Sequence, residues 1–288
     1  MTLAPADTLD RAAPANPRWG RRPVSGVRRL SRGSSLALGL SVTWFSLLVL
    51  IPLAAVVVQA TTGGWSGFVD VLSNPQTTAA LRLTVMSALV VTALNVIVGP
   101  TIAWVLTRDR FRGAAILDVI IDIPFALPTI VAGLVLLALY GPHNPLGINI
   151  ANAQPAVFFA LAFVTLPFVV RTVQPVIEEL DTDVEEAAAS LGAKPLTTFR
   201  RVVLPSLVPA VAAGASMSFA RGISEYGSLV LLSGNLPFKT EVASVRVISY
   251  IENGEKASAA VVASVLLVVA LIVIVALDVI QRGVARRG

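Results

Sequence analysis

Long apolar stretches alternate with short polar segments along the sequence. Each stretch is long enough for a helix that crosses a bilayer core of roughly 30 Å, which needs about 20 apolar residues. Because a backbone in lipid can satisfy its hydrogen bonds inside a helix, the pattern predicts an all-α polytopic membrane protein of about six transmembrane helices. The six predicted spans cover residues 36–58, 81–107, 116–140, 156–176, 207–232 and 257–280.

Basic residues flank alternate ends of these spans. Seven arginines precede the first span, whereas the segments 59–78 and 141–154 contain no Lys or Arg. Since cytoplasmic loops carry an excess of positive charge, this distribution predicts a multi-pass protein of the plasma membrane with both termini in the cytoplasm. Short basic segments follow the second, fourth and sixth spans and contain Arg108, Arg110, Arg112, Lys194, Arg200, Arg201, Arg282, Arg286 and Arg287.

Residues 1–33 differ from the rest of the chain, because they are rich in Ala, Pro and Arg and lack apolar periodicity. This composition is typical of a disordered segment, so we expect a basic cytoplasmic tail over 1–33 and a transmembrane domain over 34–288. The apolar run that follows the tail is too long for the apolar region of a signal peptide, which covers about 7–15 residues.

Composition narrows the function classes. The 288 residues are 55% hydrophobic and 14% charged, compared with about 25% charged in soluble domains. The net charge of +5 comes from basic residues beside apolar spans, so we expect membrane lipid as a partner and no nucleic acid. The chain has no cysteine, its single histidine, His143, lies in a turn-like segment, and no phosphate-binding P-loop motif occurs. We therefore expect no metal site, no catalytic site and no ATP site in this chain.

A polar loop over residues 181–205 interrupts the apolar pattern between the fourth and fifth spans. Asp183 and Glu186 have the spacing of a capping box, which predicts a short helix over 184–191. Gly192 suits the position after a helix end, and Pro195 suits the first turn of a second helix. By pattern alone, this loop is also compatible with an amphipathic helix on the membrane surface. The second helix has an apolar face formed by Leu196, Phe199 and Val202 or Val203.

The spacing within this loop resembles the EAA loop of ABC-importer permeases. Glu186-Ala187-Ala188 is followed by three residues, Gly192, nine residues and then Val202-x-Leu204-Pro205. Only Val202, where the family pattern has isoleucine, departs from it. The resemblance implies a pair of coupling helices that docks into a groove of a cytoplasmic ATPase subunit. The docking residues that it implies are Glu185, Glu186, Ala187, Ala188, Gly192, Leu204 and Pro205.

Ionisable residues within the fifth predicted span are candidates for the transport path. Arg221 and Glu225 are four residues apart and share one face of a helix. Because charges in a membrane interior are costly, they indicate either a structural ion pair or a lining of the translocation path. Pro128 interrupts the third span, together with Pro124 and Gly133, so that this helix is also a candidate for the path or its gate.

Other polar residues of the spans have simpler explanations. Asp118 and Asp122 lie near the start of the third span, where we expect pairing with Arg110 or Arg112. Asn95, deep in the second span, is expected to make a hydrogen bond between helices. Arg171 is expected at the inner end of the fourth span.

Beyond the loop, four segments resemble the T-type permease subunits of bacterial sulfate and thiosulfate importers. They are IPFALPTIVAGL (123–134), LPFVVRTVQPVIEEL (166–180), EEAAASLGA (185–193) and SFARGISEYGSLVLLSGNLPFKTE (218–241). Ser224 departs from the glycine expected before Glu-Tyr-Gly. Molybdate permeases share parts of these segments and are the main alternative. A secondary transporter driven by an ion gradient is a further alternative; it would need a carboxylate within the membrane that binds the coupling ion, and Glu225 is the one good candidate. A scaffolding membrane protein is another alternative.

The resemblance implies a type I ABC-importer permease fold in the bacterial cytoplasmic membrane. It also implies three partners: a W-type permease subunit, an ABC ATPase dimer and an extracytoplasmic sulfate-binding protein. The permease subunit is then not an enzyme and carries no cofactor, since ATP and Mg are bound by the partner ATPase.

Overall fold

The computed structural model describes residues 32–109 and 111–285, in which all regular secondary structure is helical. The chain divides into two units, Met1–Ile51 and Pro52–Gly288. Of the predicted tail, residues 1–31 lie outside the described residues, so the tail stays a prediction. In the first unit, α1 (Arg32–Phe45) and the π-helical η1 (Ser46–Leu50) carry large apolar side chains that are mostly exposed.

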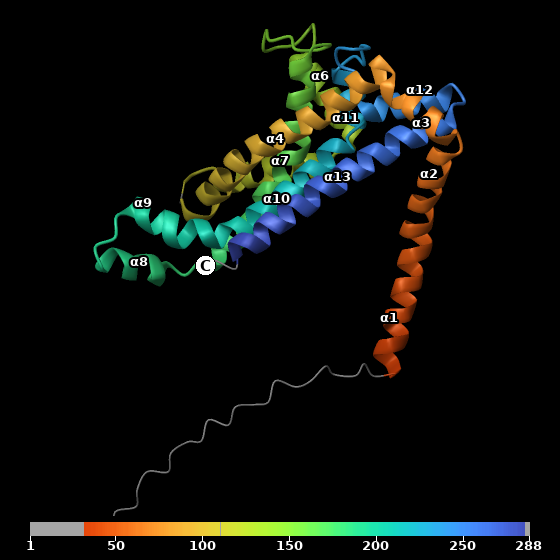
Figure 1. Cartoon of the computed structure of the whole chain (residues 1–288). Coiled ribbons are helices and arrows are strands. Elements are labelled where there is room, and N and C mark those ends of the chain that lie inside the picture. The colour runs from red at the N-terminus through yellow and green to blue at the C-terminus, as the bar shows by residue number, and fades with distance from the viewer. Residues whose placement is uncertain (1–31, 110, 286–288) are drawn as a thin grey trace, which may run out of the picture. The chain divides into compact units, whose positions relative to one another are not determined.

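Four long helices run side by side in the second unit (Figure 1). They are α4 (Pro75–Arg108), α7 (Gln154–Glu179), α10 (Leu204–Ile223) and α13 (Lys256–Ala285). At one end of this bundle lie α8 and α9, and at the other end lie α3, α11 and α12 (Figure 1). The shorter helices are α2 (Ile51–Thr61), α3 (Gly64–Ser73), α5 (Ala114–Ala126), α6 (Thr129–Tyr140), α11 (Gly227–Leu232) and α12 (Ala243–Glu252).

Five helical segments of the described residues are long and apolar enough to cross a membrane. They correspond to five of the predicted spans and are Gly33–Thr61, Pro75–Arg108, Gln154–Glu179, Pro195–Ile223 and Lys256–Gly283. The second span begins earlier than predicted because the Asn74 side chain accepts hydrogen bonds from the backbone N–H groups of Gln76 and Thr77 and caps the helix.

The third predicted span is not one helix but two, α5 and α6, separated at Leu127 and Pro128. A residue before proline is pushed out of the helical region, and Leu127 accordingly adopts an extended backbone with ψ of 135°. Pro124, in contrast, lies within α5 without ending it. The prediction that proline interrupts this span is therefore confirmed at Pro128.

The fifth predicted span is also divided, since α10 ends at Ile223 and α11 begins at Gly227. In a continuous helix, the N–H of Ser228 would donate to the carbonyl of Ser224. It donates instead to Oε1 of Glu225, at 2.8 Å. The prediction of one continuous helix was wrong here because a side-chain carboxylate replaces a backbone acceptor.

Two helices lie between the predicted spans, where the sequence pattern predicted no helix. Amphipathic α3 packs Phe68 and Leu72 beside α13, whereas Trp65 is 78% exposed and stacks on Phe68. Amphipathic α12 packs against α4 and α13 and ends before Gly254, which has φ of +79°. Apolar residues at spacings of three and four were the available signal for both helices.

α7 is the centre of the second unit, and its neighbours approach it closely through glycine. A Cβ atom on Gly99 of α4 would lie 2.7 Å from Val169 Cγ1, and one on Gly214 of α10 would lie 2.9 Å from Val169 Cα. Small residues at helix interfaces permit such contacts in membrane proteins. Val169 is therefore enclosed from two sides, and none of its surface is exposed.

A polar junction lies one helical turn from these glycine contacts. The Asn95 amide nitrogen of α4 donates to Thr165 Oγ1 of α7 at 2.8 Å and to Ser218 Oγ of α10 at 3.1 Å. All three residues are buried. The expected hydrogen bond of Asn95 between helices is confirmed, and it joins three helices rather than two.

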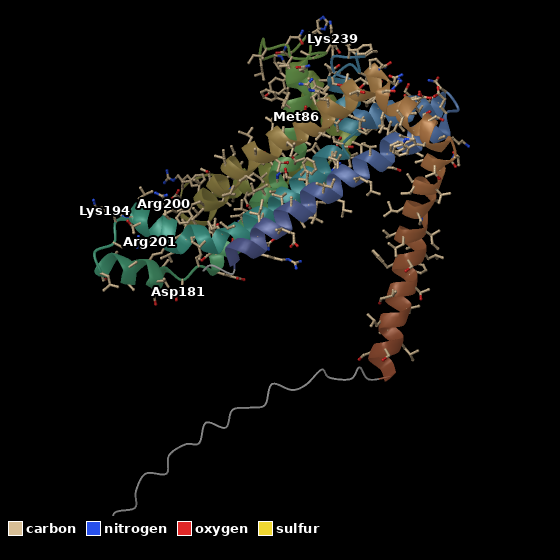
Figure 2. All side chains as sticks on the ribbon, viewed as in Figure 1. Met86, Asp181, Lys194, Arg200, Arg201 and Lys239 are labelled. Carbon is tan, nitrogen blue, oxygen red and sulfur yellow. The ribbon has the colours of Figure 1, made fainter. Side chains whose placement is uncertain are left out.

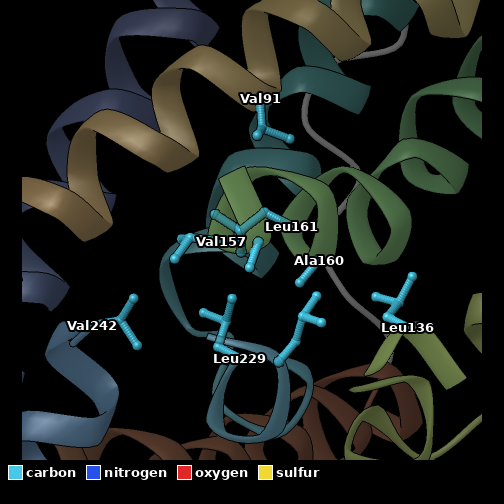
Figure 3. Close-up of a cluster of buried hydrophobic side chains, with 9 residues drawn as sticks. Val91, Leu136, Val157, Ala160, Leu161, Leu229 and Val242 are labelled. Atoms are coloured by element: carbon cyan, nitrogen blue, oxygen red, sulfur yellow. The ribbon is translucent and has the colours of Figure 1, made fainter. Parts of the chain in front are cut away.

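The apolar core around α7 extends to the two breaks. One cluster joins residues of α4, α6, α7 and α11, among them Val91, Leu136, Val157, Leu161 and Leu229 (Figure 3). A second cluster near the other end of α7 includes Val173, Ile177 and Leu207. The half-helices α6 and α11 are thus held on the same central helix.

α6 and α11 also pack on each other through reciprocal glycine contacts. A Cβ atom on Gly133 of α6 would lie 2.8 Å from the Ser228 carbonyl oxygen and 2.9 Å from Ser228 Cα. A Cβ atom on Gly227 of α11 would collide with the Thr129 hydroxyl and lie 2.8 Å from the N of Ile130. The two breaks therefore lie together, with backbone against backbone.

Substituting Gly133→Ala should destabilise the protein by about 1–3 kcal/mol, because the added methyl group overpacks rigid backbone. The free energy of unfolding in detergent measures the effect. Gly67→Ala is the matched control, since a Cβ atom on Gly67 of α3 meets nothing within 4 Å. Equal stability of the two variants would contradict the proposed backbone contact.

Candidate functional site: the polar loop and the ion pairs of the bundle

The polar loop folds into α8 (Thr182–Ser190), α9 (Pro195–Thr198) and the π-helical η2 (Phe199–Val203), which leads into α10. α8 begins earlier than the predicted 184–191. Its N-cap is Asp181, whose side chain accepts from the N–H of Asp183 at 2.9 Å. The predicted capping box of Asp183 and Glu186 was therefore wrong, because an aspartate two residues earlier satisfies the end of the helix.

The end of α8 matches the sequence prediction. Gly192 has φ of +81°, and its N–H donates to the Ala189 carbonyl at 2.9 Å. The N–H of Ala193 donates to the Ala188 carbonyl at 3.0 Å, which closes the turn. Pro195 begins α9, as predicted. Glycine is required here because other residues adopt this backbone conformation only with strain.

The outer surface of the loop combines apolar and charged side chains. Leu191 is 90% exposed and Leu196 is 67% exposed, although both are large and apolar. Glu186 and Ala187 are exposed as well, and Glu186 makes no ion pair with any described residue. Figure 2 shows Lys194, Arg200 and Arg201 near α9 and Asp181 beside α8. Exposed apolar side chains rimmed by charge are typical of a surface that binds another protein.

Leu191 was not among the docking residues predicted from the sequence. Its position immediately before Gly192, at the end of the helix, could have indicated from the sequence that its side chain is exposed. Of the second helix's predicted apolar face, Phe199 and Val203 line a cavity beside the bundle, whereas Leu196 is exposed. Leu204 begins α10 and Pro205 lies in its first turn.

Glu185 lies on the other side of α8 and is engaged within the chain. Its Oε1 is 2.9 Å from Nη2 of Arg108, at the end of α4. Arg108 also lies over the Trp104 ring, at 5.4 Å from its centroid, and Trp104 contacts Phe199 edge to face at 6.1 Å. A cavity of about 1010 Å³ lies beside these contacts, lined by α4, the loop, α10 and the end of α13.

Arg221 and Glu225 form an ion pair at the break between α10 and α11, with Nη2 to Oε2 at 2.6 Å. The Glu225 side chain is fully buried, whereas that of Arg221 is 28% exposed. Oε1 of Glu225 accepts from the N–H and the hydroxyl of Ser228. One oxygen of the carboxylate therefore pairs with the arginine, while the other accepts hydrogen bonds at the start of α11.

Asp118 and Asp122 of α5 pair with Arg171 of α7, and no ion pair of the described residues joins them to Arg112. Nη1 of Arg171 is 2.7 Å from Asp118, and Nε is 2.7 Å from Asp122. The partner found was not predicted because it is distant in sequence: Arg171 lies on α7, about two turns before the end of that helix. Arg110 lies outside the described residues. Within the described part of the chain, no group of three or more His, Asp or Glu residues could hold a metal ion.

Pro128 lies at the N-cap of α6, beside the reciprocal glycine contacts. The structure thus brings Pro128 into the same region as the break that contains Glu225. Neither break is joined to the polar loop through ion pairs of the described residues. The candidate docking residues and the candidate path residues belong to two separate regions of the bundle.

Comparison with known proteins identifies close relatives. The family described as binding-protein-dependent transport system inner membrane component matches residues 97–287. The chain is 40% identical over 267 residues to the sulfate transport system permease protein CysT of Salmonella typhimurium, covering 90% of this chain and 96% of the relative. It is 39% identical over 269 residues to the protein of that name from Synechocystis, covering 90% and 94%.

Solved structures share the fold at lower identity. A bacterial alginate ABC transporter in complex with its periplasmic protein contains a chain with a TM-score of 0.72 at 16% identity, covering 87% of this chain and 94% of that one. An inward-facing methionine ABC transporter gives 0.58 at 21% identity, covering 74% and 99%. The fold is that of type I ABC-importer permeases.

Substituting Glu225→Ala should cost about 3–5 kcal/mol of folding free energy, because it leaves Arg221 uncompensated and removes the cap of α11. The midpoint of thermal unfolding in detergent measures this loss. Glu252→Ala is the matched control, since Glu252 is exposed. The double variant with Arg221→Met should be less destabilised than Glu225→Ala alone; equal destabilisation would show that the two side chains act independently.

Proposed function

The chain belongs to the family of binding-protein-dependent transport system inner membrane components, and from this membership we propose that it is the permease subunit of an ATP-driven importer for sulfate and thiosulfate. The proposal of sulfate as the substrate depends on the similarity to sulfate transport system permease proteins over nine-tenths of the chain. Its function is transport rather than catalysis, as in those relatives.

We propose three kinds of partner for this subunit. A second, W-type permease completes the translocation path, an ABC ATPase dimer binds on the cytoplasmic side, and an extracytoplasmic sulfate-binding protein delivers the anion. ATP and Mg are bound by the ATPase, so this chain needs no cofactor. The ATPase and the binding protein are supported by the family, whose description is that of a binding-protein-dependent transport system.

The polar loop is the proposed docking site for the ATPase. Leu191 and Leu196 offer apolar side chains to a groove, and Ala187 beside them lets another backbone approach closely. Glu186 is free to pair with a basic group of the partner, whereas Glu185 is held by Arg108. Gly192 fixes the angle between the two parts of the loop.

The orientation in the membrane follows from charge. Arg108, Lys194, Arg200 and Arg282 lie on segments at the end of the bundle that carries α8 and α9 (Figure 1). Because positive residues favour the cytoplasmic side, this end and both termini are proposed to be cytoplasmic.

The proposed path lies between this subunit and its permease partner, near the two helix breaks. Pro128, Arg221 and Glu225 are the residues that we propose for it. The Arg221 side chain is 28% exposed while it is paired, and we propose that its guanidinium offers donors to a passing anion. Glu225 is buried, paired with Arg221 and hydrogen-bonded by Ser228, which argues against a carboxylate that exchanges protons or sodium in a secondary transporter.

Substituting Gly192→Val should reduce co-purification of the ATPase about tenfold while the protein stays in the membrane, because a β-branched residue resists φ of +81°. Gly254→Val is the matched control, since Gly254 has φ of +79° and equally open surroundings. Glu186→Lys should have the same effect as Gly192→Val. Normal ATPase co-purification and normal uptake in both variants would exclude this loop as the docking site.

Radiolabelled sulfate uptake in cells that lack this chain, with and without complementation, tests the substrate. We expect the chain to restore uptake, thiosulfate to compete strongly and molybdate to compete weakly. Uptake should persist when ion gradients are collapsed and stop when ATP is depleted. A loss of molybdate uptake without a sulfate defect would assign the permease to a different oxyanion, and uptake that follows the ion gradient would refute the ATP-driven mechanism.

A further inference from the structure

The cytoplasmic end of α4 is held by both parts of the polar loop. Arg108 contacts α8, because its Nη2 is 2.9 Å from Glu185 Oε1 and 3.4 Å from the Leu180 carbonyl oxygen. Trp104 contacts η2 through the edge-to-face packing with Phe199. Arg108 and Trp104 also contact each other, so the four side chains form one continuous set.

This set is a large part of what joins α8 to the bundle. Among the described helices, α8 packs mainly against α9, and its backbone contacts with the bundle helices are sparse or absent. The cavity of about 1010 Å³ lies between the loop and the bundle and is lined by Trp104, Glu185 and Phe199 themselves. The loop is therefore connected to α4 across a poorly packed region by a few specific side chains.

The Arg108 contact is built to hold a fixed geometry. The side chains of Arg108 and Glu185 are only 19% and 30% exposed, so water screens the pair weakly. Nε of Arg108 is buried and has no hydrogen-bond partner among the described residues, so the guanidinium is held by Glu185, the Leu180 carbonyl and the Trp104 ring. A displacement of α8 that kept this pair intact would have to move Arg108 with it.

α4 is suited to carry such a displacement into the bundle. Pro100 lies inside α4, one turn before Trp104, and it removes a helical hydrogen bond. It also lines the cavity, so the segment beyond it has room to tilt on that side, although Ala103 packs on α7 on the other. On the other side of Pro100, Gly99 and Asn95 fix α4 to α7 and α10. Helices bend preferentially at such prolines.

We propose that Trp104 and Arg108 form a strut that transmits movement of the ATPase-docked loop to α4, with Pro100 as its hinge. They are positioning residues for transport, distinct from the exposed residues that bind the ATPase. The inference rests on the proposed function, since it assumes that an ATPase drives the loop. It assigns to Glu185 an internal role in place of contact with the partner.

The test compares Arg108→Met with Arg112→Met, the matched control on an exposed arginine for which no ion pair is described. Each variant is purified with its partner subunits and reconstituted with the binding protein. We expect Arg108→Met to retain the ATPase and its hydrolysis but to import about five- to tenfold less anion per ATP hydrolysed. Arg112→Met should match the unmodified chain. Loss of the ATPase from the Arg108→Met assembly would assign Arg108 to docking and overturn the strut.

A charge exchange separates the ion pair from a general effect on folding. Arg108→Glu alone should lose import per ATP as Arg108→Met does, and the double variant with Glu185→Arg should recover most of it. A double variant no better than Arg108→Glu would overturn the proposal.

A third measurement needs neither partner nor substrate. Because the chain has no cysteine, spin labels can be placed at Ser190→Cys of α8 and Gln281→Cys of α13. We expect Arg108→Met to broaden the distance distribution between them, whereas Arg112→Met leaves it narrow. An unchanged distribution would refute the strut even if the imported anion proves to be other than sulfate.

Discussion

The close approach of α4 and α10 to α7 is the contact on which the rest of the bundle depends. Apolar side chains gain little by packing together in lipid, so helices there associate through tight fit and internal hydrogen bonds. Gly99 and Gly214 supply the fit around Val169, and Asn95 supplies the hydrogen bonds to Thr165 and Ser218. Both devices act on the same stretch of α7, which makes that stretch the fixed reference for the elements at either end.

The elements at the two ends of the bundle are attached to this central stretch of α7 in different ways. At one end, the half-helices α6 and α11 pack backbone against backbone, and Glu225 satisfies the break that separates α11 from α10. At the other end, the polar loop lies beside a cavity and is joined to α4 by an ion pair and aromatic contacts. A rigid end and a loosely attached end fit a protein that must hold a pathway in shape while it responds to a partner.

The sequence was sufficient where local rules decide the structure. Apolar length predicted six spans, five of which correspond to helices long enough to cross a membrane, and the preference of Gly192 and Pro195 for particular backbone positions predicted the turn of the loop. It was insufficient where distant residues compete. Arg171 was not recognisable as the partner of Asp118, because the two are joined only by tertiary packing. Asp181 displaced the expected cap for a local reason, since two nearby aspartates can both satisfy the capping rule and the sequence did not say which one would.

In the reciprocal glycine contact between α6 and α11, the atoms that hold the two half-helices together differ from the side chains that form their exposed surface. Since the contact is made by backbone atoms and the Thr129 hydroxyl, the exposed side chains of Ile130, Leu134 and Val135 take no part in it. Changes at these positions alter the surface without altering the joint. The joint between the half-helices is thereby insulated from substitutions on the surface that they present.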